Sequence, residues 1–296
     1  MRIKTLPLLL LLALTACGSD NNGNDGDNNS TANNANSNFA NTNPITHRME
    51  FPKLKDGTNV IIVHTLSSGE VNYSVEYDTQ KKSTRWSCYE LYGSNRETHT
   101  KRWYAGEGED QYPQNPLLDK QYRWESDPFW RSGYDHGHLC PSADRLNSLE
   151  ANKQTFYLTN MMPQVNGFNA KVWANMENWV RKQITITSKD TLFVVKGGTI
   201  DNASQYTTLA RTGGNMIVPK YYYMAVLMRN SDGYKAMGFW IEHKASNATD
   251  LSPYVVNINR LEQLTGIDFF CNLPDDTENR VEDLSLERVK RAWGFQ

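Results

Sequence analysis

The sequence lacks the short motifs that most often assign a chemistry by themselves. Its 296 residues contain no Cys-x-x-Cys pair and no glycine-rich loop of the GxGxxG or GxxxxGK[ST] type. The first absence argues against cysteine-based zinc sites and thiol redox sites, and the second argues against the common loops that hold nucleotide phosphates. Internal repeats and coiled-coil heptads are missing as well. Any chemistry must therefore come from another arrangement of polar residues.

The chain also has no excess of positive charge. It carries 31 Lys and Arg against 33 Asp and Glu, which gives a formal net charge of −2. A nucleic acid would not be attracted to the protein as a whole, so binding one would require a local cluster of Arg and Lys or a bound metal. With 39% hydrophobic and 11% aromatic residues, the composition is that of a globular protein that can bury a core.

The N-terminus has no apolar run long enough to remain as a membrane-spanning helix. Its hydrophobic stretch, residues 8–14, follows a basic start and ends shortly before Cys17. This order is typical of a signal peptide, and residues 14–17 resemble a bacterial lipobox. We expect residues 1–16 to be a lipoprotein signal peptide and Cys17 to be lipidated; an ordinary signal peptide is the alternative. The predicted product is an exported bacterial lipoprotein at the outer membrane or cell surface, with the periplasmic face left open.

The next segment has the composition of a spacer. Residues 18–44 are almost all Asn, Asp, Gly, Ser, Thr and Ala, and such a stretch cannot bury enough apolar surface to offset the entropy of ordering it. We expect residues 17–45 to form a disordered tether and residues 46–296 to form the folded domain. Three cysteines remain in this domain, an odd number, and we favour a disulfide between Cys88 and Cys271 because Cys140 lies inside the motif described below.

Periodicity in the domain predicts an α+β fold with a mixed or antiparallel sheet core flanked by helices. Helical spacing of apolar residues predicts one helix over about 169–184, and a second, shorter helix over about 252–264 ends at Gly266. Runs with apolar or aromatic residues at period two, or short apolar runs bounded by turn residues, predict the strands. These runs are 59–63, 71–77, 85–91, 191–195, 216–218, 221–228 and 236–241.

Polar residues with reactive or metal-binding capacity are concentrated between residues 134 and 177. The segment contains Asp-His-Gly-His at 135–138 and Asn-Met-Met-Pro-Gln at 160–164, followed by the first predicted helix. Asn169 and Glu177 lie eight residues apart on that helix, which places them about 80° apart around its axis. Both side chains therefore share one side of the helix and can line a common site.

This ordered set resembles the DNA/RNA non-specific endonuclease family of ββα-metal (His-Me finger) nucleases. That family has an Asp-Arg-Gly-His core, then Asn-x-x-Pro-Gln, then a helix that runs from an Asn to a Glu, and the resemblance covers most of the predicted domain. It implies a metal finger built from the strand pair around His138 and the helix from Asn169. It also implies metal-dependent hydrolysis of phosphodiester bonds in DNA and RNA, with 5′-phosphate products.

The resemblance implies a role for each residue of the set. His138 is the general base, Asn169 holds one Mg²⁺, Glu177 orients the waters of the metal, and Asn160 holds the geometry of the base and metal loop. A histidine can accept a proton from water at neutral pH. Mg²⁺ prefers oxygen ligands and keeps several of its waters, so it needs few protein ligands; Mn²⁺ or another divalent cation is the alternative.

Four further residues are assigned to the substrate. Asp135, His136 and Gln164 are expected to bind it, and Arg123 is the candidate for a phosphate contact. His136 stands where the family has Arg, so a fixed positive charge next to the base is missing. We interpret His136 as a variant that modulates phosphate binding.

Two alternatives to a magnesium nuclease follow from the same residues. His136 and His138 could form a zinc pair, although no Asp-His or Glu-x-x-His partner lies nearby in the sequence. The chain could also be a surface lipoprotein that binds a polyanion or a protein, with catalysis impaired by the change at position 136. Beside the motif, Asp144 and Arg145 are expected to form a structural ion pair.

Overall fold

The computed structural model describes residues 34–295. The predicted signal peptide, the predicted lipidation site Cys17 and the first part of the predicted tether lie outside the described residues. Within residues 34–295, every helix is too short or too polar to cross a membrane.

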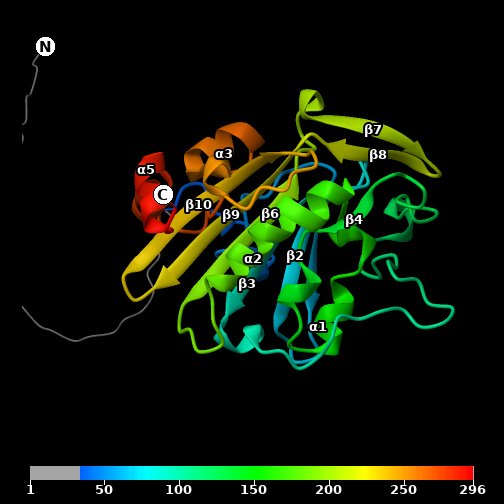
Figure 1. The fold of residues 1–296 in the computed structure, drawn as a ribbon, viewed down its shortest axis with the longest axis horizontal. Helices are drawn as coiled ribbons and strands as arrows, with labels where there is room; N and C mark the ends of the chain where they lie inside the picture. The colour runs from blue at the N-terminus through cyan, green and yellow to red at the C-terminus, as the bar shows by residue number, and fades with distance from the viewer. Residues whose placement is uncertain (1–33, 296) are drawn as a thin grey trace, which may run out of the picture.

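An antiparallel sheet forms the centre of the molecule (Figure 1). Its seven strands are arranged in the order β1-β2-β3-β6-β9-β10-β11, and every pair of neighbours is antiparallel. The predicted α+β fold is therefore confirmed in its antiparallel form. The strands are β1 (Asn59–Thr65), β2 (Val71–Asp78), β3 (Ser83–Tyr92), β6 (Thr191–Gly198), β9 (Tyr221–Asn230), β10 (Gly233–Glu242) and β11 (Val255–Val256).

The sheet separates two hydrophobic cores because successive side chains of a strand point to opposite faces. On β6, Leu192 and Val194 pack into one core, whereas Phe193 and Val195 pack into the other. The whole of β6 is buried. The central strands thus read as continuous apolar runs, as expected for strands covered on both faces.

Different segments cover the two faces. The first core contains the buried side of α2 (Ala174–Lys182) and residues of α5 (Leu286–Ala292), and the second contains residues of α3 (Ile258–Thr265) and α4 (Asp275–Glu282). Figure 1 shows α2 lying across the sheet. As predicted, Gly266 ends α3 in the left-handed conformation, with a φ of 68°.

A small hairpin and the start of α2 form the predicted finger. The hairpin consists of β4 (Asp135–His138) and β5 (Met161–Gln164), and a π-helical segment (Phe168–Trp173) leads directly into α2. A short helix, α1 (Leu149–Gln154), lies between the two strands in sequence. A second hairpin, β7 (Tyr206–Arg211) and β8 (Gly214–Pro219), projects beside the finger (Figure 1).

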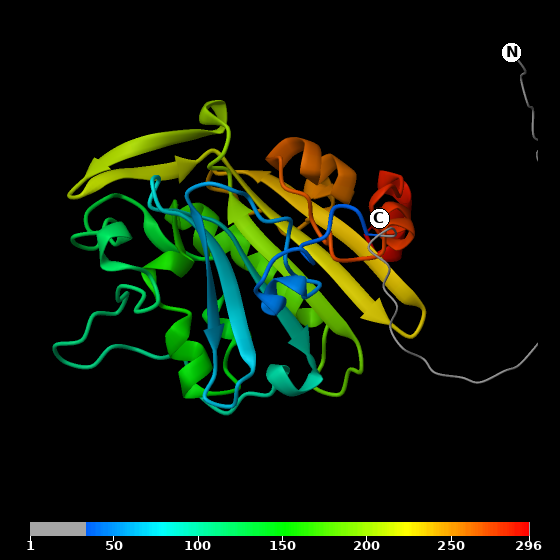
Figure 2. The ribbon, with the colours of Figure 1, turned by 180° about the vertical axis from the view of Figure 1, so that it is seen from behind.

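The N-terminal boundary of the folded domain was predicted too late in the sequence. Residues 34–45, expected to belong to the tether, hydrogen-bond with the C-terminal part of the chain. The Asn38 backbone N–H donates to Asn272 Oδ1 at 2.9 Å, and Asn36 Nδ2 donates to Glu278 Oε1 at 3.0 Å. Figure 2 shows this blue segment beside the orange and red C-terminal elements. Composition missed the contact because Asn side chains contribute hydrogen bonds here and not apolar surface.

Two local predictions are wrong. The second predicted helix begins six residues later than expected, at Ile258, because residues 255–256 form β11 at the sheet edge. The disulfide between Cys88 and Cys271 is absent: these two cysteines and Cys140 are free and buried among the described residues. Cys88 lies on β3, whereas Cys271 accepts a contact from Asn38 in the N-terminal segment.

Candidate active site

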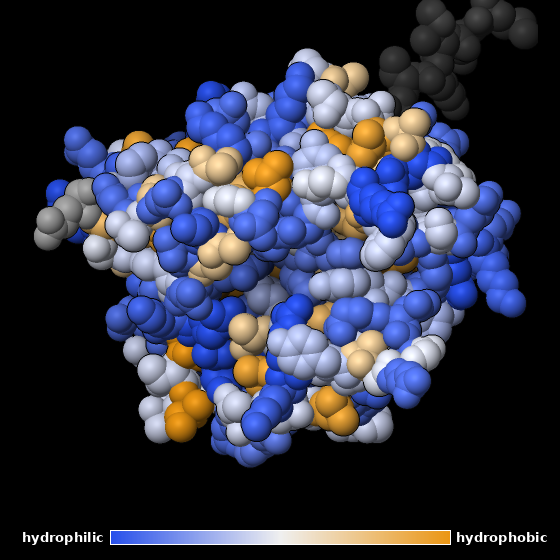
Figure 3. Space-filling view, turned by 45° about the vertical axis from the view of Figure 1, so that its right-hand side comes forward, coloured by the Kyte–Doolittle hydropathy of each residue, from blue (hydrophilic) through white to orange (hydrophobic). Residues whose placement is uncertain are grey.

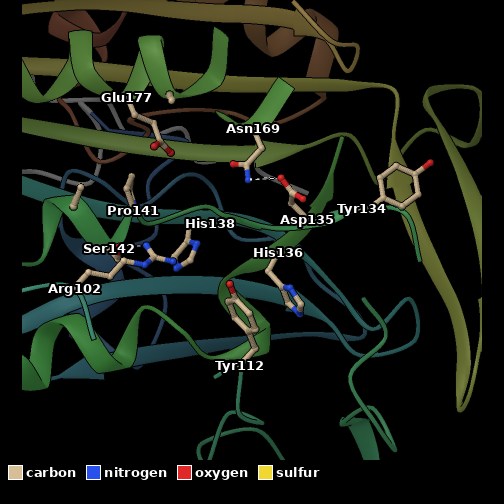
Figure 4. A pocket seen from close by; sticks show the side chains of 12 residues that line it. Arg102, Tyr112, Tyr134, Asp135, His136, His138, Pro141, Ser142, Asn169 and Glu177 are labelled. Carbon is tan, nitrogen blue, oxygen red and sulfur yellow. Dashed lines mark hydrogen bonds between the residues drawn. The ribbon is translucent and has the colours of Figure 1, made fainter. Parts of the chain in front are cut away.

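The finger borders a pocket of about 470 Å³ that collects most of the predicted site residues. Its wall includes five of them: Asp135, His136, His138, Asn169 and, from α2, Glu177 (Figure 4). The face of the molecule that carries β4, β7 and β8 is largely hydrophilic, with small separate apolar patches (Figure 3). A pocket of this kind suits a polar ligand. The other residues that line it are Arg102, Tyr112, Tyr134, Pro141, Ser142, Ala143 and Ala174.

His138 ends β4, and Asn160 fixes the chain directly after it. Asn160 Oδ1 accepts the Cys140 N–H at 2.8 Å, and Asn160 Nδ2 donates to the Cys140 and Thr155 carbonyl oxygens, each at 2.8 Å. The Asn160 backbone oxygen also accepts the Leu139 N–H at 2.9 Å. Asn160 is fully buried. It lies beneath the site and acts as a positioning residue for the loop that follows the candidate base.

The surroundings of His138 favour its neutral form. Burial, and then the nearby cations Arg102 and Lys196, lower the pKa of His138 to about 3. The ring packs edge-on against Phe156, with centroids 5.1 Å apart. Nε2 is buried and has no hydrogen-bond partner within residues 34–295. A neutral imidazole at pH 7 can accept a proton, which is what a general base requires.

Asp135 determines which atom of the Asn169 amide faces the pocket. Asn169 Nδ2 donates to Asp135 Oδ2 at 3.0 Å, and Asn166 Nδ2 donates to the same oxygen at 3.0 Å. A carboxylate can only accept hydrogen bonds, so the amide nitrogen must face Asp135 and the amide oxygen must point away from it. Figure 4 shows the Asn169 oxygen turned toward the side of the pocket where Glu177 lies.

Helix packing brings Asn169 and Glu177 to the same pocket, as predicted. Val172, Met176 and Val180 are buried against the sheet, which leaves the polar side of the segment at the pocket. The helix is not uniform, because Phe168–Trp173 is a π-helix and only the part from Ala174 is α-helical. The wider π turns are a common feature of functional sites.

Glu177 forms a buried ion pair with a residue that the sequence patterns did not identify. Its Oε1 pairs with Nζ of Lys196 on β6, and the side chains are 16% and 1% exposed respectively. Burial raises the pKa of Glu177, and Lys196 opposes this rise. The signal in the sequence was a lysine at a core-facing position of an otherwise apolar strand.

His136 is held in an aromatic and acidic environment at the edge of the pocket. Its Nε2 lies 3.0 Å from Oδ2 of Asp127, and its ring stacks on Tyr112 with centroids 3.6 Å apart and contacts Phe129. Burial raises the pKa of Asp127, but the hydrogen bond and the charge of His136 outweigh this and leave the pKa below its ordinary value. The imidazole therefore has a fixed orientation.

Two predicted substrate contacts are not at the pocket. Gln164 is fully buried, and its side chain packs against Gly137 of the neighbouring strand. Arg123 Nε donates to the Leu118 carbonyl oxygen at 2.7 Å, and its Nη2 donates to the Pro116 carbonyl oxygen at 3.0 Å. Sequence patterns could not exclude these two residues, because they do not show which side chains are packed in the interior or hydrogen-bonded to the backbone.

Arg102 is the arginine that lines the pocket. Its Nη1 donates to Ser142 Oγ at 2.5 Å, and its guanidinium lies over the Phe156 ring at 4.7 Å from the centroid. In the sequence, this arginine is followed by Trp103 and Tyr104. A basic residue next to aromatic residues was the signal that could have identified it.

The expected ion pair between Asp144 and Arg145 does not form. Asp144 pairs instead with Arg181 of α2, with 2.5 Å between Oδ1 and Nε. Arg145 donates to backbone carbonyl oxygens, including that of Asn72 at 2.8 Å. The Asp144–Arg181 pair holds α2 close to the loop that follows His138.

The pocket fits a hydrated divalent cation better than a zinc ion. Among residues 34–295, the His, Cys, Asp and Glu side chains form no group of three or more that could hold a metal, and Nε2 of His136 is already taken by Asp127. Tightly bound zinc needs three or four such ligands. The Asn169 amide oxygen beside the Glu177 carboxylate is a small all-oxygen set, which suits a cation that keeps most of its waters.

Comparison with known proteins assigns the chain to a family of nucleases. Residues 56–276 match the family described as DNA/RNA non-specific endonuclease. A protein named Nuclease from Nostoc sp. is 29% identical over 221 residues, which cover 71% of this chain and 75% of that protein. Nuclease C1 from Cunninghamella echinulata is 28% identical over 219 residues, and these cover 70% and 83% of the two chains.

Similarity extends to a mitochondrial protein and to a solved structure. Mitochondrial nuclease from Saccharomyces cerevisiae is 28% identical over 248 residues, covering 73% of each chain. A chain in the crystal structure of an EndoG/EndoGI complex has a TM-score of 0.63 and 22% identity, covering 79% of this chain and 94% of that chain. At this identity, the structural likeness establishes the fold.

Proposed function

Because the chain belongs to the DNA/RNA non-specific endonuclease family and is a nuclease, we propose that it hydrolyses phosphodiester bonds of DNA and RNA with His138 as the general base and a Mg²⁺ ion at Asn169. One observation carries the proposal: His138 and the amide oxygen of Asn169 meet at the same pocket. A proton acceptor and a metal ligand are the two groups that hydrolysis of a phosphodiester requires.

The chemical step uses His138 to activate water. The neutral imidazole takes a proton from a water molecule, whose oxygen attacks phosphorus while the bond from phosphorus to the 3′ oxygen breaks. The leaving 3′ oxygen takes up a proton from solvent water, and His138 returns its proton to solvent, so the products are a 5′-phosphate and a 3′-hydroxyl. Asn160 supports this step indirectly, because its three side-chain hydrogen bonds hold the loop that follows the base.

The remaining pocket residues bind and orient. When bound, the divalent cation would stabilise the negative charge that develops on the phosphate and on the leaving oxygen. Asp135 keeps the Asn169 oxygen directed into the pocket, and Glu177 would accept hydrogen bonds from water near that oxygen. Arg102 lies at the pocket wall, where it could donate a hydrogen bond to a phosphate oxygen, and His136 could do so through Nδ1 when its ring carries a second proton.

Substrate range and location follow from separate observations. No step above reads a base or uses a 2′-hydroxyl, so both DNA and RNA, single or double stranded, are proposed as substrates. The N-terminal sequence supports an exported lipoprotein anchored through Cys17. We favour degradation of nucleic acid outside the cytoplasm.

A plasmid-nicking assay with the purified full chain tests the proposal. The protein should degrade plasmid DNA and RNA with Mg²⁺ and lose activity with a chelator. His138→Ala should lower the rate by about 10²–10⁴-fold, the usual contribution of a general base. His99→Ala is the matched control because this histidine is exposed and pairs only with Glu97 at the surface.

Other outcomes identify the alternatives. A folded protein that is inert with Mg²⁺, Mn²⁺ and other divalent cations would support the impaired binding protein and reject the nuclease mechanism. Stoichiometric, tightly held zinc in the purified protein would contradict a magnesium site at Asn169.

A further inference from the structure

Lys196 is a lysine in a position where the fold calls for an apolar side chain. It follows Leu192 and Val194 on the same face of β6, and both of those residues belong to the core beneath α2. Lys196 is 1% exposed. A charged side chain in such a place loses most of its hydration, so its retention requires strong compensating contacts.

Two contacts compensate the buried charge. The ammonium of Lys196 forms the ion pair with Oε1 of Glu177, and it lies 5.0 Å from the centroid of the Trp173 ring. Both partners come from the segment that also carries Asn169. The contacts therefore join the central strand to the one helix that reaches the candidate metal position.

The ion pair determines how Glu177 can face the pocket. With Oε1 held from below by Lys196, the rotation of the carboxylate is restricted. Figure 4 shows this carboxylate directed into the pocket, on the side where Asn169 and His138 lie. Without the lysine, a carboxylate in this place would either turn toward solvent or take up a proton, because burial disfavours its charged form.

Lys196 also acts on the candidate base. Its charge is one of the causes that lower the pKa of His138, and it opposes the rise in the pKa of Glu177 that burial produces. Both effects favour the protonation states that the proposed mechanism needs at neutral pH. The other titratable or charged groups that act on Glu177 or His138 are Arg181 on α2, Asp144 after β4, Tyr89 on β3, Cys140, His136 and Arg102.

We propose that Lys196 is a positioning residue for the nuclease reaction: its ion pair holds the Glu177 carboxylate in the pocket, on the side of the Asn169 amide oxygen. The inference rests on the proposed function, since it concerns the same pocket. It goes further by assigning the orientation of Glu177 to a lysine from the central strand.

A purely structural role would give a different result, and the chain contains a matched control for it. Lys235 on β10 also lies over a tryptophan, with Nζ 4.4 Å from the centroid of the Trp293 ring, and it donates to the Ala292 carbonyl oxygen at 3.0 Å. It does not line the pocket. Lys235→Met removes a lysine–tryptophan contact without touching the site.

The experiment compares kcat and KM of Lys196→Met, Lys196→Arg, Lys235→Met and the wild-type full chain on plasmid DNA. Without the ion pair the Glu177 carboxylate is free to turn, so kcat of Lys196→Met should fall by about tenfold while KM changes by less than about twofold. Lys196→Arg keeps a cation that can pair with Glu177 and should recover part of the lost activity. Lys235→Met should keep the wild-type kcat and KM.

A second readout does not depend on turnover. Carbon-13 NMR of labelled glutamate carboxyls at pH 7 should show a shifted Glu177 signal in Lys196→Met and the wild-type signal in Lys235→Met, because only the first variant removes the ion pair. If Lys196→Met does not fold, Lys196→Gln takes its place and should give changes in the same direction, because its shorter, uncharged side chain cannot form the ion pair.

Two results would overturn the inference. One is a Lys196→Met variant with the wild-type kcat, and the other is a loss of kcat with an unchanged Glu177 carboxyl signal, which would indicate a structural role alone. Failure of the nuclease proposal is recognised separately, because an inactive wild type or a fully active His138→Ala would appear before Lys196 is tested.

Discussion

At the scale of single residues, His136 shows how a substitution can be accommodated in a catalytic motif. Tyr112 covers one face of its ring, Phe129 packs against it, and both oxygens of Asp127 lie about 3 Å from Nε2. A planar guanidinium could use the same environment, since arginine stacks on aromatic rings and pairs with carboxylates. The site thus retains the surroundings that would suit the family's arginine.

This accommodation predicts that His136→Arg is tolerated and strengthens phosphate binding. The permanent charge should add about one phosphate contact, so kcat/KM on DNA should rise at low salt and fall more steeply with added salt, by about one unit of slope. His136→Gln is the uncharged control and should flatten the dependence. The measurement is kcat/KM from 50 to 300 mM NaCl. An arginine variant with the wild-type slope would show that position 136 does not face a phosphate.

At the scale of secondary structure, the finger depends on close contact between the two strands of its hairpin. Gly137 on β4 lies next to the buried side chain of Gln164 on β5. A Cβ atom at position 137 would lie 2.3 Å from Cδ of Gln164. A glycine is therefore required at position 137, because no side chain fits there. Gln164 stabilises the hairpin and does not bind the substrate.

Gly137→Ala should accordingly distort the finger. Overpacking of this kind costs about 1–3 kcal/mol, and the displacement of His138 should lower kcat by about tenfold or more, because small misplacements of catalytic groups are costly. The double variant Gly137→Ala, Gln164→Ala removes the crowding side chain and should recover much of the activity. Gly106→Ala is the control, since its added Cβ would make an ordinary contact at 3.5 Å. Unchanged activity in Gly137→Ala would contradict the close-packing argument.

The position of the helical part of the finger was predicted correctly, but the helix type of its first turns was not. Sequence spacing put Asn169 and Glu177 on one side of an α-helix, and both line the pocket. The first six residues, Phe168–Trp173, form a π-helix. Apolar periodicity cannot distinguish the two helix types over one or two turns, because Val172 and Met176 remain buried in either.

At the scale of the whole molecule, the N-terminal segment and the C-terminal helices close one end of the domain around a group of carboxylates. Asn36 Nδ2 donates to Asp268 Oδ2 at 3.1 Å and to Glu278 Oε1 at 3.0 Å. Glu282 is 5% exposed, and its Oε1 is buried without a hydrogen-bond partner among the described residues. Burial, and then the neighbouring carboxylates, raise the pKa of Glu282 to about 10.

This group predicts a stability that falls as pH rises. A carboxyl whose pKa is higher in the folded state binds its proton more tightly there, so its contribution is present below the unfolded pKa, about 4.3, and is lost progressively as pH rises through the folded value. Glu282→Gln is neutral at every pH. It should raise the melting temperature by about 3–10 °C at pH 8 and by much less at pH 5.

Thermal unfolding of the two proteins at pH 5 and pH 8 measures the effect. Glu287→Gln, at an exposed position of α5, is the control and should show little change at either pH. An equal shift at both pH values for Glu282→Gln would mean that packing and not charge sets the effect.

The local features of this protein, its strands and the order of its site residues, could be predicted from sequence patterns. Period-two and short apolar runs predicted most of the strands, because such runs follow from the geometry of a single strand, but they missed β7 and β11. The ordered set His138, Asn160, Asn169 and Glu177 specified the family and the neighbourhood of the site. These are short-range patterns, and the geometry of a single chain segment is enough to interpret them.

Which polar side chains are available for binding or catalysis depends on the tertiary structure. Gln164 and Arg123 have suitable chemistry, but packing and backbone hydrogen bonds use them elsewhere. Arg102 and Lys196 lie outside the motif in sequence, and only folding brings Arg102 to the pocket and Lys196 to Glu177. Burial and charge environment depend on every surrounding segment at once, so no local pattern could have set the pKa of His138 or paired Glu177 with a lysine from the central strand.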